Sequence, residues 1–312
     1  MIVYIIKRIF LMIPIILALT FVVFSIVSLT PSDAAYAILG SEYTEENGAQ
    51  LRAELGLDKP FFVRYFKYIV GLAQGDMGIS YINKAPVVDQ LKARFPNTFK
   101  ITIMSMTFSV LIGLPIGVVT ATKPNSFLSR LSLVIGMMGI SIPGFWLGML
   151  MILFFAVKLG WLPSSGVDEG FRSLILPSLT LGINFLASVM RTTRSSMMET
   201  VRTDYVRTAR SKGLSERKVI FDHALGNALM PTITVVGVQV GTLLGSMVLT
   251  ETVFAIPGTG RLLVEAINKR DMPTVLGALV LLGVCVAVCN LVVDIIYAYI
   301  DPRIKAQYTG RT

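Results

Sequence analysis

Six long runs of apolar residues divide this chain of 312 residues. A helix needs about 20 such residues to cross the hydrocarbon core of a bilayer, and the runs are close to that length. Membrane-spanning strands would instead show segments of about ten residues with alternating hydrophobicity. The sequence therefore predicts an all-α, polytopic membrane protein with six transmembrane helices. These are Ile9–Leu29, Thr98–Thr122, Leu131–Val157, Leu174–Met190, Leu229–Phe254 and Thr274–Ile300.

The distribution of Lys and Arg over the loops predicts the orientation of the spans. With the N-terminus inside, 15 of the 28 basic residues lie in cytoplasmic pieces and five lie in the two short outer loops. The other eight lie between Thr30 and Lys100, in a segment long enough to cross the membrane regardless of its charge. Both termini are therefore predicted to be cytoplasmic. The net charge of +9 then reflects membrane topology, and no nucleic-acid partner is expected.

The predicted spans divide the chain into four parts. Residues 1–29 form an N-terminal transmembrane helix, and residues 30–97 form an extracytoplasmic segment. Residues 98–300 form a five-helix core with a cytoplasmic elbow at residues 199–228, and residues 301–312 form a cytoplasmic tail. Cleavage of the first helix as a signal peptide is an alternative, because Ala35-Tyr36-Ala37 offers a cleavage pattern. The first apolar run exceeds the roughly 7–15 residues of a signal core, which favours a retained helix.

The extracytoplasmic segment contains a predicted amphipathic helix. Asp58-Lys59-Pro60 is typical of a helix start, because proline fits the first turn. Apolar and aromatic side chains then recur at helical spacing, with Arg64 and Lys67 on the other side. Such a helix can lie at the membrane surface, or its aromatic residues can form the small core of an outer cap, and the sequence allows both. The recurring residues are Phe62, Tyr65, Phe66, Ile69 and Leu72.

A basic, helix-prone segment separates the fourth and fifth spans. Its first helix is predicted over Glu199–Lys212, and Gly213 follows as a C-terminal cap, since glycine adopts the left-handed conformation at little cost. Ser215 is expected to cap a second helix from Glu216, and Pro231 to mark the turn into the next span. Two helices around a glycine form an elbow that can fit a groove in a partner protein; an ordinary solvated loop is the alternative. The apolar stripe of the first helix is Val201, Tyr205, Thr208 and Ala209.

Small and polar residues inside the spans indicate helix contacts and a pathway for a solute. Gly237, Gly241 and Gly245 form a small-xxx-small repeat, which lets two helix backbones approach closely. Generic helix packing and an interface that shifts during transport both fit this repeat. A polar residue within a span more often bonds a neighbouring helix than a solute. With that alternative open, the candidate pathway-lining residues are Asn184, Gln239 and Ser141.

The sequence contains no group that could power transport or catalyse a reaction. No G-x-x-x-x-G-K-[ST] phosphate-binding motif occurs, and no ionisable residue lies near the middle of a predicted span, where ion-coupled transporters commonly need one. His223 is the only histidine, which excludes an H-E-x-x-H metal site, and Cys285 and Cys289 lie alone in the last span. We therefore expect no metal, cofactor or catalytic residue in this chain, and an external source of energy.

Two blocks in the basic segment carry a family resemblance. Tyr205–Ser215 reads YVRTARSKGLS, and His223–Pro231 reads HALGNALMP. Both resemble the permease subunits of ABC importers, and most closely the B-type permeases of the dipeptide, oligopeptide and nickel group. In the general family signature, E-A-A-x-x-x-G followed by I-x-L-P, Ala209, Gly213 and Leu225 match, whereas the chain departs at Arg207, His223 and Gly226. Similar blocks extend over nearly the whole chain, among them Gly75–Gly78, Ser141–Gly148 and Glu251–Gly260.

The resemblance implies a type I ABC importer fold and a complex in which this chain forms half of a translocation pore. The expected partners are a second homologous permease subunit, two ATPase subunits that bind ATP and Mg²⁺, an extracytoplasmic substrate-binding protein, and the lipid bilayer of the cell (inner) membrane. The imported substrate would be a peptide or a related small solute. Coupling to the ATPases would run through Tyr205, Arg207, Thr208, Ala209, Gly213 and Leu225.

Other functions remain as alternatives to the importer. A secondary transporter or channel without an ATPase is the main one, although the absence of charges in the middle of the spans argues against it. An integral membrane enzyme lacks a catalytic set. A scaffold or sensor that binds an ATPase without transporting anything would keep the elbow, but would leave the glycine-rich spans without a purpose.

Overall fold

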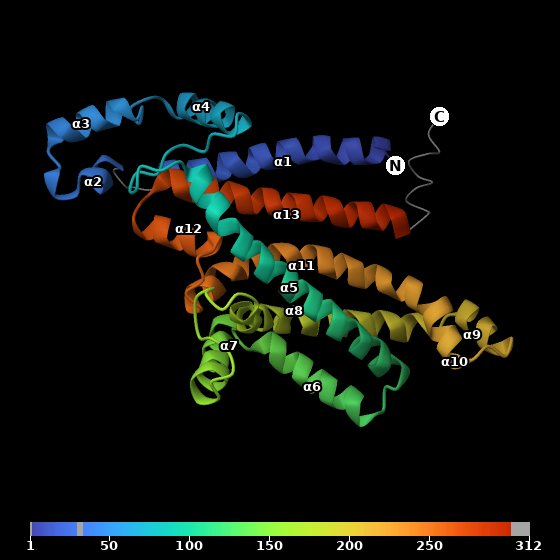
Figure 1. Ribbon diagram of the computed structural model, residues 1–312. Helices are drawn as coiled ribbons and strands as arrows, with labels where there is room; N and C mark the ends of the chain where they lie inside the picture. Colours follow the sequence, from blue (N-terminus) through green and yellow to red (C-terminus); the bar gives the residue numbers. More distant parts are fainter. Residues whose placement is uncertain (1, 30–33, 301–312) are drawn as a thin grey trace. The chain divides into compact units, whose positions relative to one another are not determined.

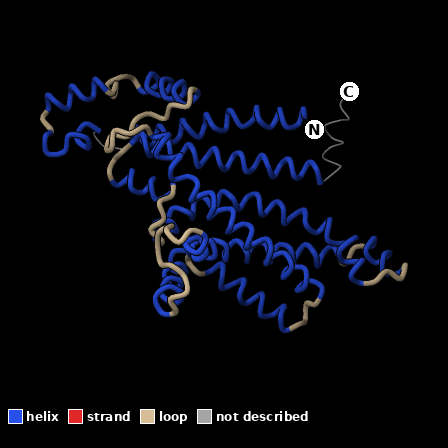
Figure 2. Tube along the Cα trace, viewed as in Figure 1, coloured by secondary structure: helices blue, strands red, loops and turns tan. Residues whose placement is uncertain are grey.

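The regular structure of the chain is helical. The computed structural model describes residues 2–29 and 34–300; within them it contains helices and one isolated β-bridge, between Ile79 and Pro86 (Figure 1, Figure 2). This confirms the predicted all-α class. The chain divides into two compact units. Among the described residues, the first comprises Phe99–Ile256 and residues 289–300, and the second comprises Ile2–Thr98 and Pro257–Val288.

The first unit is built around one long helix, α8 (Phe171–Thr200). This helix packs against α6, α7 and α11, and half of its residues are buried because its small and apolar side chains face neighbours on several sides. The core around it includes Leu176, Phe185 and Met247. The remaining elements are the larger part of α5 (Val87–Thr122), α6 (Phe127–Ser141), α7 (Gly144–Met151), the π-helical η2 (Ile152–Lys158), α9 (Asp204–Ser211), α10 (Glu216–Lys218), the π-helical η3 (Val219–Ala224), α11 (Leu225–Val253) and the end of α13 (Met272–Ile300).

The second unit contains the first helix and the segments predicted to be extracytoplasmic. Its core joins the start of α5 to α12 and α13 through Val87, Leu263 and Ala278, all buried. Thr44 begins α3 because its side chain accepts a hydrogen bond from the backbone N–H of Asn47, an N-terminal cap. The elements are α1 (Ile2–Leu29), α2 (Ala34–Leu39), the 3₁₀ turn η1 (Gly40–Glu42), α3 (Glu45–Glu54), α4 (Phe61–Ala73), the start of α5, α12 (Thr259–Asn268) and the start of α13.

The helix expected after Asp58-Lys59-Pro60 is present as α4, and Pro60 directly precedes it. One side of α4 packs on α1, where the ring of Phe24 lies 5.5 Å from the rings of Phe61 and Tyr65. The opposite side leaves apolar residues exposed, which suits a membrane surface. The predicted stripe is therefore divided between a small aromatic core and an exposed face. The exposed apolar residues are Phe62, Val63, Phe66 and Val70.

Five described helices are long and apolar enough to cross a membrane, and a bent pair would raise the number to six. That pair corrects the prediction of a continuous helix over Leu131–Val157. The chain turns by 106° between Ser129–Ser141 and Gly144–Lys158. Ile142 is extended at the break, because a residue before a proline is disfavoured in the helical conformation. The prediction of six spans with both termini inside stays a prediction.

Candidate functional site

The predicted elbow is a short helix between two tight turns. After α8 ends at Thr200, residues 201–203 turn the chain, and α9 runs from Asp204 to Ser211. Gly213 then has a φ of +77°, and its N–H bonds the carbonyl of Arg210 at 2.9 Å. The left-handed conformation expected at Gly213 is present. A residue with a Cβ would be strained there by roughly 1–2 kcal/mol.

The inner side of α9 is fixed to the core of its own unit. Val206 is fully buried and Ala209 is 5% exposed. Both belong to a cluster that α5, the end of α8 and the second helix of the elbow complete, and Leu225 packs against it. The predicted stripe was wrong in phase, because it missed Val206 and included Thr208, which is exposed. Ala209 therefore holds the elbow to this chain and has little surface left for a partner.

The outer side of α9 carries three of the predicted coupling residues. Tyr205 is 45% exposed, and Arg207 and Thr208 are exposed beside it. The hydroxyl of Tyr205 accepts a hydrogen bond from the side-chain amide of Asn227 at 2.8 Å, which ties α9 to α11. This face is therefore a polar and aromatic surface on a helix whose opposite side is packed against the core of its own unit.

An ion pair braces the elbow across the glycine turn. The guanidinium of Arg210 donates to both carboxylate oxygens of Glu216, at 2.7 and 3.1 Å. It also donates to the carbonyl of Val201 at 3.3 Å. The hydrogen bond to Glu216 raises the pKa of Arg210. Because the pair is exposed, its contribution to stability is at most about 1 kcal/mol, and it joins the two sides of the turn at Gly213.

The second helix of the elbow begins at the predicted residue but differs from the prediction in its cap and at its other end. It starts at Glu216, but Ser215 provides no side-chain cap. It then passes through the π-helical η3 directly into α11, so that the helical stretch Glu216–Val253 has no turn at Pro231. Pro231 lies inside α11. A membrane helix tolerates an internal proline where neighbouring groups compensate for the missing N–H.

Two of the three candidate pathway residues share one cavity. Asn184 of α8 and Gln239 of α11 line a cavity of about 340 Å³ in the first unit. Arg191, which the sequence assigned to the cytoplasmic loop, lines it as well because α8 continues to Thr200. Ser141 is not among the lining residues; its hydroxyl donates to the carbonyl of Met137 at 2.9 Å.

The predicted glycine repeat marks a close helix contact at one position. A Cβ on Gly237 would lie 2.6 Å from the side chain of Val293, whereas nothing lies within 4 Å of one on Gly245. Gly241, the middle residue of the repeat, lies half-buried in α11. A close approach to α8 that the repeat did not predict comes from α5, because a Cβ on Gly117 would lie 2.7 Å from that of Thr193. The same small-xxx-small spacing was present in α5 and was not singled out as an interface.

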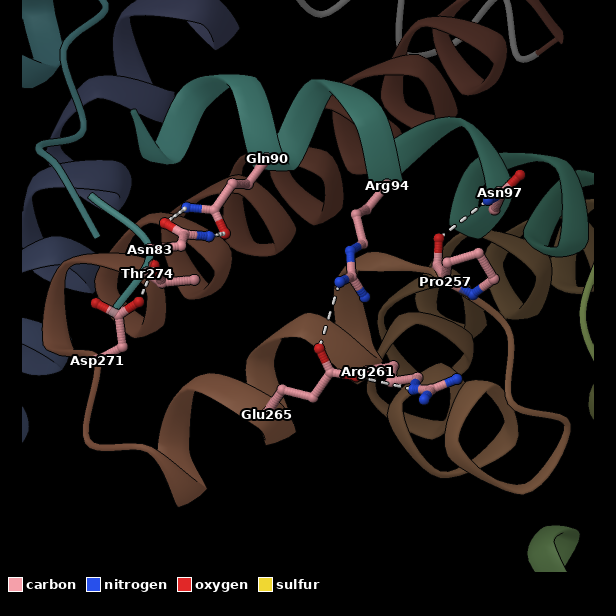
Figure 3. A network of polar contacts seen from close by, with 9 residues as sticks. All are labelled: Asn83, Gln90, Arg94, Asn97, Pro257, Arg261, Glu265, Asp271 and Thr274. Atoms are coloured by element: carbon pink, nitrogen blue, oxygen red, sulfur yellow. Dashed lines mark hydrogen bonds and ion pairs between the residues drawn. The ribbon is translucent and has the colours of Figure 1, made fainter. Parts of the chain in front are cut away.

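The two segments predicted to face outward are joined by a polar network in the second unit (Figure 3). Asp271, which is 4% exposed, lies just before α13. Its carboxylate accepts hydrogen bonds from the hydroxyls of Ser80 and Thr274 and from the backbone N–H of Tyr81 at 2.9 Å. Because the donors come from both segments, this carboxylate fixes the loop of residues 76–86 to the start of α13.

Further contacts of the same network connect α5 and α12. The guanidinium of Arg94 lies 3.4 Å from the carboxylate of Glu265, which also accepts a hydrogen bond from the guanidinium of Arg261 at 2.9 Å (Figure 3). The side-chain amide of Asn97 donates to the carbonyl of Pro257 at 3.0 Å. The two outer segments therefore form a single surface, which their separation in the sequence did not indicate.

Comparisons with known proteins assign the chain to a family. Residues 113–306 match the family described as "Binding-protein-dependent transport system inner membrane component", and residues 1–102 match its N-terminal region. The chain belongs to this family. It is therefore an inner-membrane permease subunit of an ABC importer, and the hydrolysis of ATP takes place on partner subunits. The alternative of a secondary transporter that works without an ATPase is set aside.

Individual relatives of this permease are similar over almost their full length. The dipeptide transport system permease protein DppB of Alkalihalophilus pseudofirmus is 40% identical, with 98% of this chain and 100% of the relative covered. The glutathione transport system permease protein GsiC of Escherichia coli K12 is 42% identical, with 97% and 98% covered. Among solved structures, the MetNI methionine ABC transporter in inward-facing conformations has a TM-score of 0.58 at 23% identity. The match covers 68% of this chain and 96% of the chain in the solved structure, and this likeness shows the fold of a type I importer permease.

No metal site accompanies these features in the part of the chain that the structure describes. Among residues 2–29 and 34–300, no group of three or more His, Cys, Asp or Glu side chains could hold a metal ion. Neither Cys285 nor Cys289 forms a disulfide. The candidate sites of the permease are therefore the elbow, the cavity lined by Asn184 and Gln239, and the outer polar surface.

Proposed function

We propose that this permease forms half of the pore of an importer for peptides or related small solutes. The substrates named for the two relatives, dipeptide and glutathione, support this class. The other half of the pore would be a second homologous permease subunit. Two ATPase subunits, each binding ATP and Mg²⁺, would complete the complex on the cytoplasmic side.

The observation that carries the proposal is the elbow. The exposed face formed by Tyr205, Arg207 and Thr208 lies on a helix that is buried on its other side and braced by Arg210. A rigid, exposed helix of this kind can transmit the movement of an ATPase to the spans. Closure of the ATPases on ATP would move the elbows and switch the pore between outward and inward openings. Gly213 would set the angle of the elbow, and both chain termini would lie on the same cytoplasmic side.

The outer polar surface is proposed to receive the substrate-binding protein. It combines the extracytoplasmic segment 30–97 with the loop around α12, and the carboxylate of Asp271 and the pair of Arg94 and Glu265 connect these two parts. A surface that is rigid before binding loses less entropy on docking. Delivery of substrate at this surface would place the solute at the outer end of the spans.

The proposal is tested by purifying the tagged permease from its native membranes in a mild detergent and identifying the proteins that accompany it. A second permease-like chain together with ATPase subunits is the expected result. A double charge reversal, Arg210→Glu with Glu216→Arg, keeps two opposite charges across the turn and should retain the ATPases. Recovery of the permease alone, combined with solute uptake that does not depend on ATP, would contradict the proposal.

A further inference from the structure

The cavity in the first unit has the size and walls of a binding site for a small solute. Its volume of about 340 Å³ falls in the usual range of ligand pockets, about 300–1,000 Å³. One wall is a face of α8, where the lining residues recur every three or four positions and therefore point the same way. A face of α11 forms a second wall, and Ile140, Gly144 and Phe145 at the bend between α6 and α7 form a third. The polar residues of the first two walls are Thr180, Asn184, Ser188, Arg191, Gln239, Thr242, Ser246 and Thr250.

Arg191 is the one ionisable residue among those that line this cavity. It lies nine residues before the end of α8, about 13 Å along the helix axis. No carboxylate of a described residue pairs with it. Charged residues within membrane helices are rare, face the interior of a bundle or a water-filled cavity, and mark solute pathways. Arg191 therefore gives the cavity a positive charge that no residue in its walls neutralises.

We propose that this cavity holds the imported solute in transit and that Arg191 binds its carboxylate. A guanidinium presents a rigid fork of N–H donors that matches a carboxylate in two parallel hydrogen bonds. Asn184, Ser188 and Gln239 can donate to and accept from the neutral amide groups of the same solute. The inference rests on the proposed function, because dipeptides and glutathione all carry a free carboxylate. It adds that the permease itself selects for that group after the binding protein has delivered the solute.

The charge of the cavity can be measured without transport. Ser188→Cys is placed in the assembled complex after Cys285 and Cys289 have been replaced by alanine, and the thiol is labelled with anionic and cationic methanethiosulfonates of similar size. Each labelling rate is expressed relative to the rate of the same reagent with a small free thiol. Opposite charges about 8 Å from a guanidinium in water then differ enough in energy for the anionic reagent to be favoured by about five-fold. Arg191→Gln should abolish this preference, and Arg191→Lys should keep it.

Protection by ligand tests the recognition of the carboxylate itself. The dipeptide Ala-Ala should slow the labelling of Ser188→Cys, whereas its C-terminal amide should not, and Arg191→Gln should remove the difference. Thr242→Cys, on the facing wall, repeats the measurement in case the first variant disturbs α8. Equal protection by the two ligands, equal rates for the two reagents, or no reaction at either cysteine would each overturn the inference.

The failure of this inference is distinguishable from a failure of the proposed function. Labelling reports on the cavity in the absence of ATP, whereas import is measured separately as ATP-dependent uptake by the assembled complex. ATP-driven uptake of Ala-Ala without carboxylate-selective protection would refute the role of Arg191 and leave the importer intact. In an importer that works as proposed here, Arg191→Gln should lower the maximal rate of Ala-Ala uptake several-fold without changing the affinity of the binding protein.

Discussion

Gly213 offers the sharpest test of how the elbow works. Its φ of +77° suits glycine, and a Cβ added there would meet nothing within 4 Å. Alanine at this position therefore adds no clash, and its whole cost is the strain of the left-handed backbone, roughly 1–2 kcal/mol. If the elbow can relieve that strain by straightening, the population of the bent form relative to straightened forms falls by a factor of about 5 to 30. The core around α8 is not touched.

The assay is a comparison of uptake with ATP hydrolysis in the reconstituted importer. Gly213→Ala should lower the amount of solute imported per ATP hydrolysed while the permease still inserts into the membrane and binds its ATPases. Gly213→Asn should lose less, because asparagine tolerates the left-handed conformation better than other residues with a side chain.

Gly226→Ala is the matched control for Gly213→Ala. A Cβ on Gly226 also meets nothing within 4 Å, but this glycine lies in α11, where alanine is favoured by up to about 1 kcal/mol. The control should behave as wild type or be slightly more stable. Wild-type coupling in Gly213→Ala, or an equal loss in Gly226→Ala, would refute the argument that backbone geometry at the turn sets the coupling.

Three further comparisons can be made by thermal unfolding of the purified permease. Gly117→Ala should destabilise it by about 1–3 kcal/mol, because the new Cβ would lie 2.7 Å from the Cβ of Thr193 in α8. Gly245→Ala should be neutral or stabilising, because its new Cβ would meet nothing within 4 Å. Equal effects of the two variants would contradict the contact between α5 and α8. Tyr65→Phe should cost about 1 kcal/mol, because the hydroxyl donates to the carbonyl of Leu17 at 3.0 Å. Tyr68→Phe should be neutral or stabilising, since its buried hydroxyl has no partner among the described residues, and a clear loss there would be unexpected. Asp271→Asn should cost about 1–3 kcal/mol, because an amide cannot accept all the hydrogen bonds that the carboxylate accepts, and unchanged stability would remove its bridging role.

The pKa of Tyr68 bears on the comparison of Tyr65→Phe with Tyr68→Phe. Burial raises the pKa of Tyr68 to about 12, so the neutral hydroxyl is retained at every pH at which the permease would be studied. The expected effect of Tyr68→Phe therefore comes from removing a neutral hydroxyl without a hydrogen bond, and it should not change between pH 6 and pH 9. A pH-dependent difference in that range would contradict this account.

Local signals in the sequence predicted much of the elbow and of the outer helix. The glycine at 213 and the proline at 60 act through backbone geometry, which depends only on the residue and its neighbours. Both were therefore found where they were expected. The phase of α9 was not predictable in the same way. A turn at residues 201–203 separates α9 from α8, so that Val206 and Ala209 face the core in place of Thr208.

Features that depend on tertiary packing could not be located from the sequence. The small-xxx-small spacing occurs in α5 and in α11, and only the fold decides that Gly117 meets a neighbour closely and Gly245 does not. Arg191 was assigned to a loop because the apolar run ends at Met190, although α8 continues for another ten residues. The break at Pro143 was visible as a local signal, but the long apolar run on both sides favoured a single span.

The measurement that tests the central claim most directly is uptake of a labelled dipeptide into proteoliposomes that contain the whole complex. The permease, its co-purifying partners and the binding protein are reconstituted with ATP on the side of the elbow. We predict accumulation that requires ATP, stops when the ATPase subunits carry an inactivating substitution in their phosphate-binding lysine, and is indifferent to an ionophore. Accumulation that proceeds without ATP and collapses with the ion gradient would contradict the account.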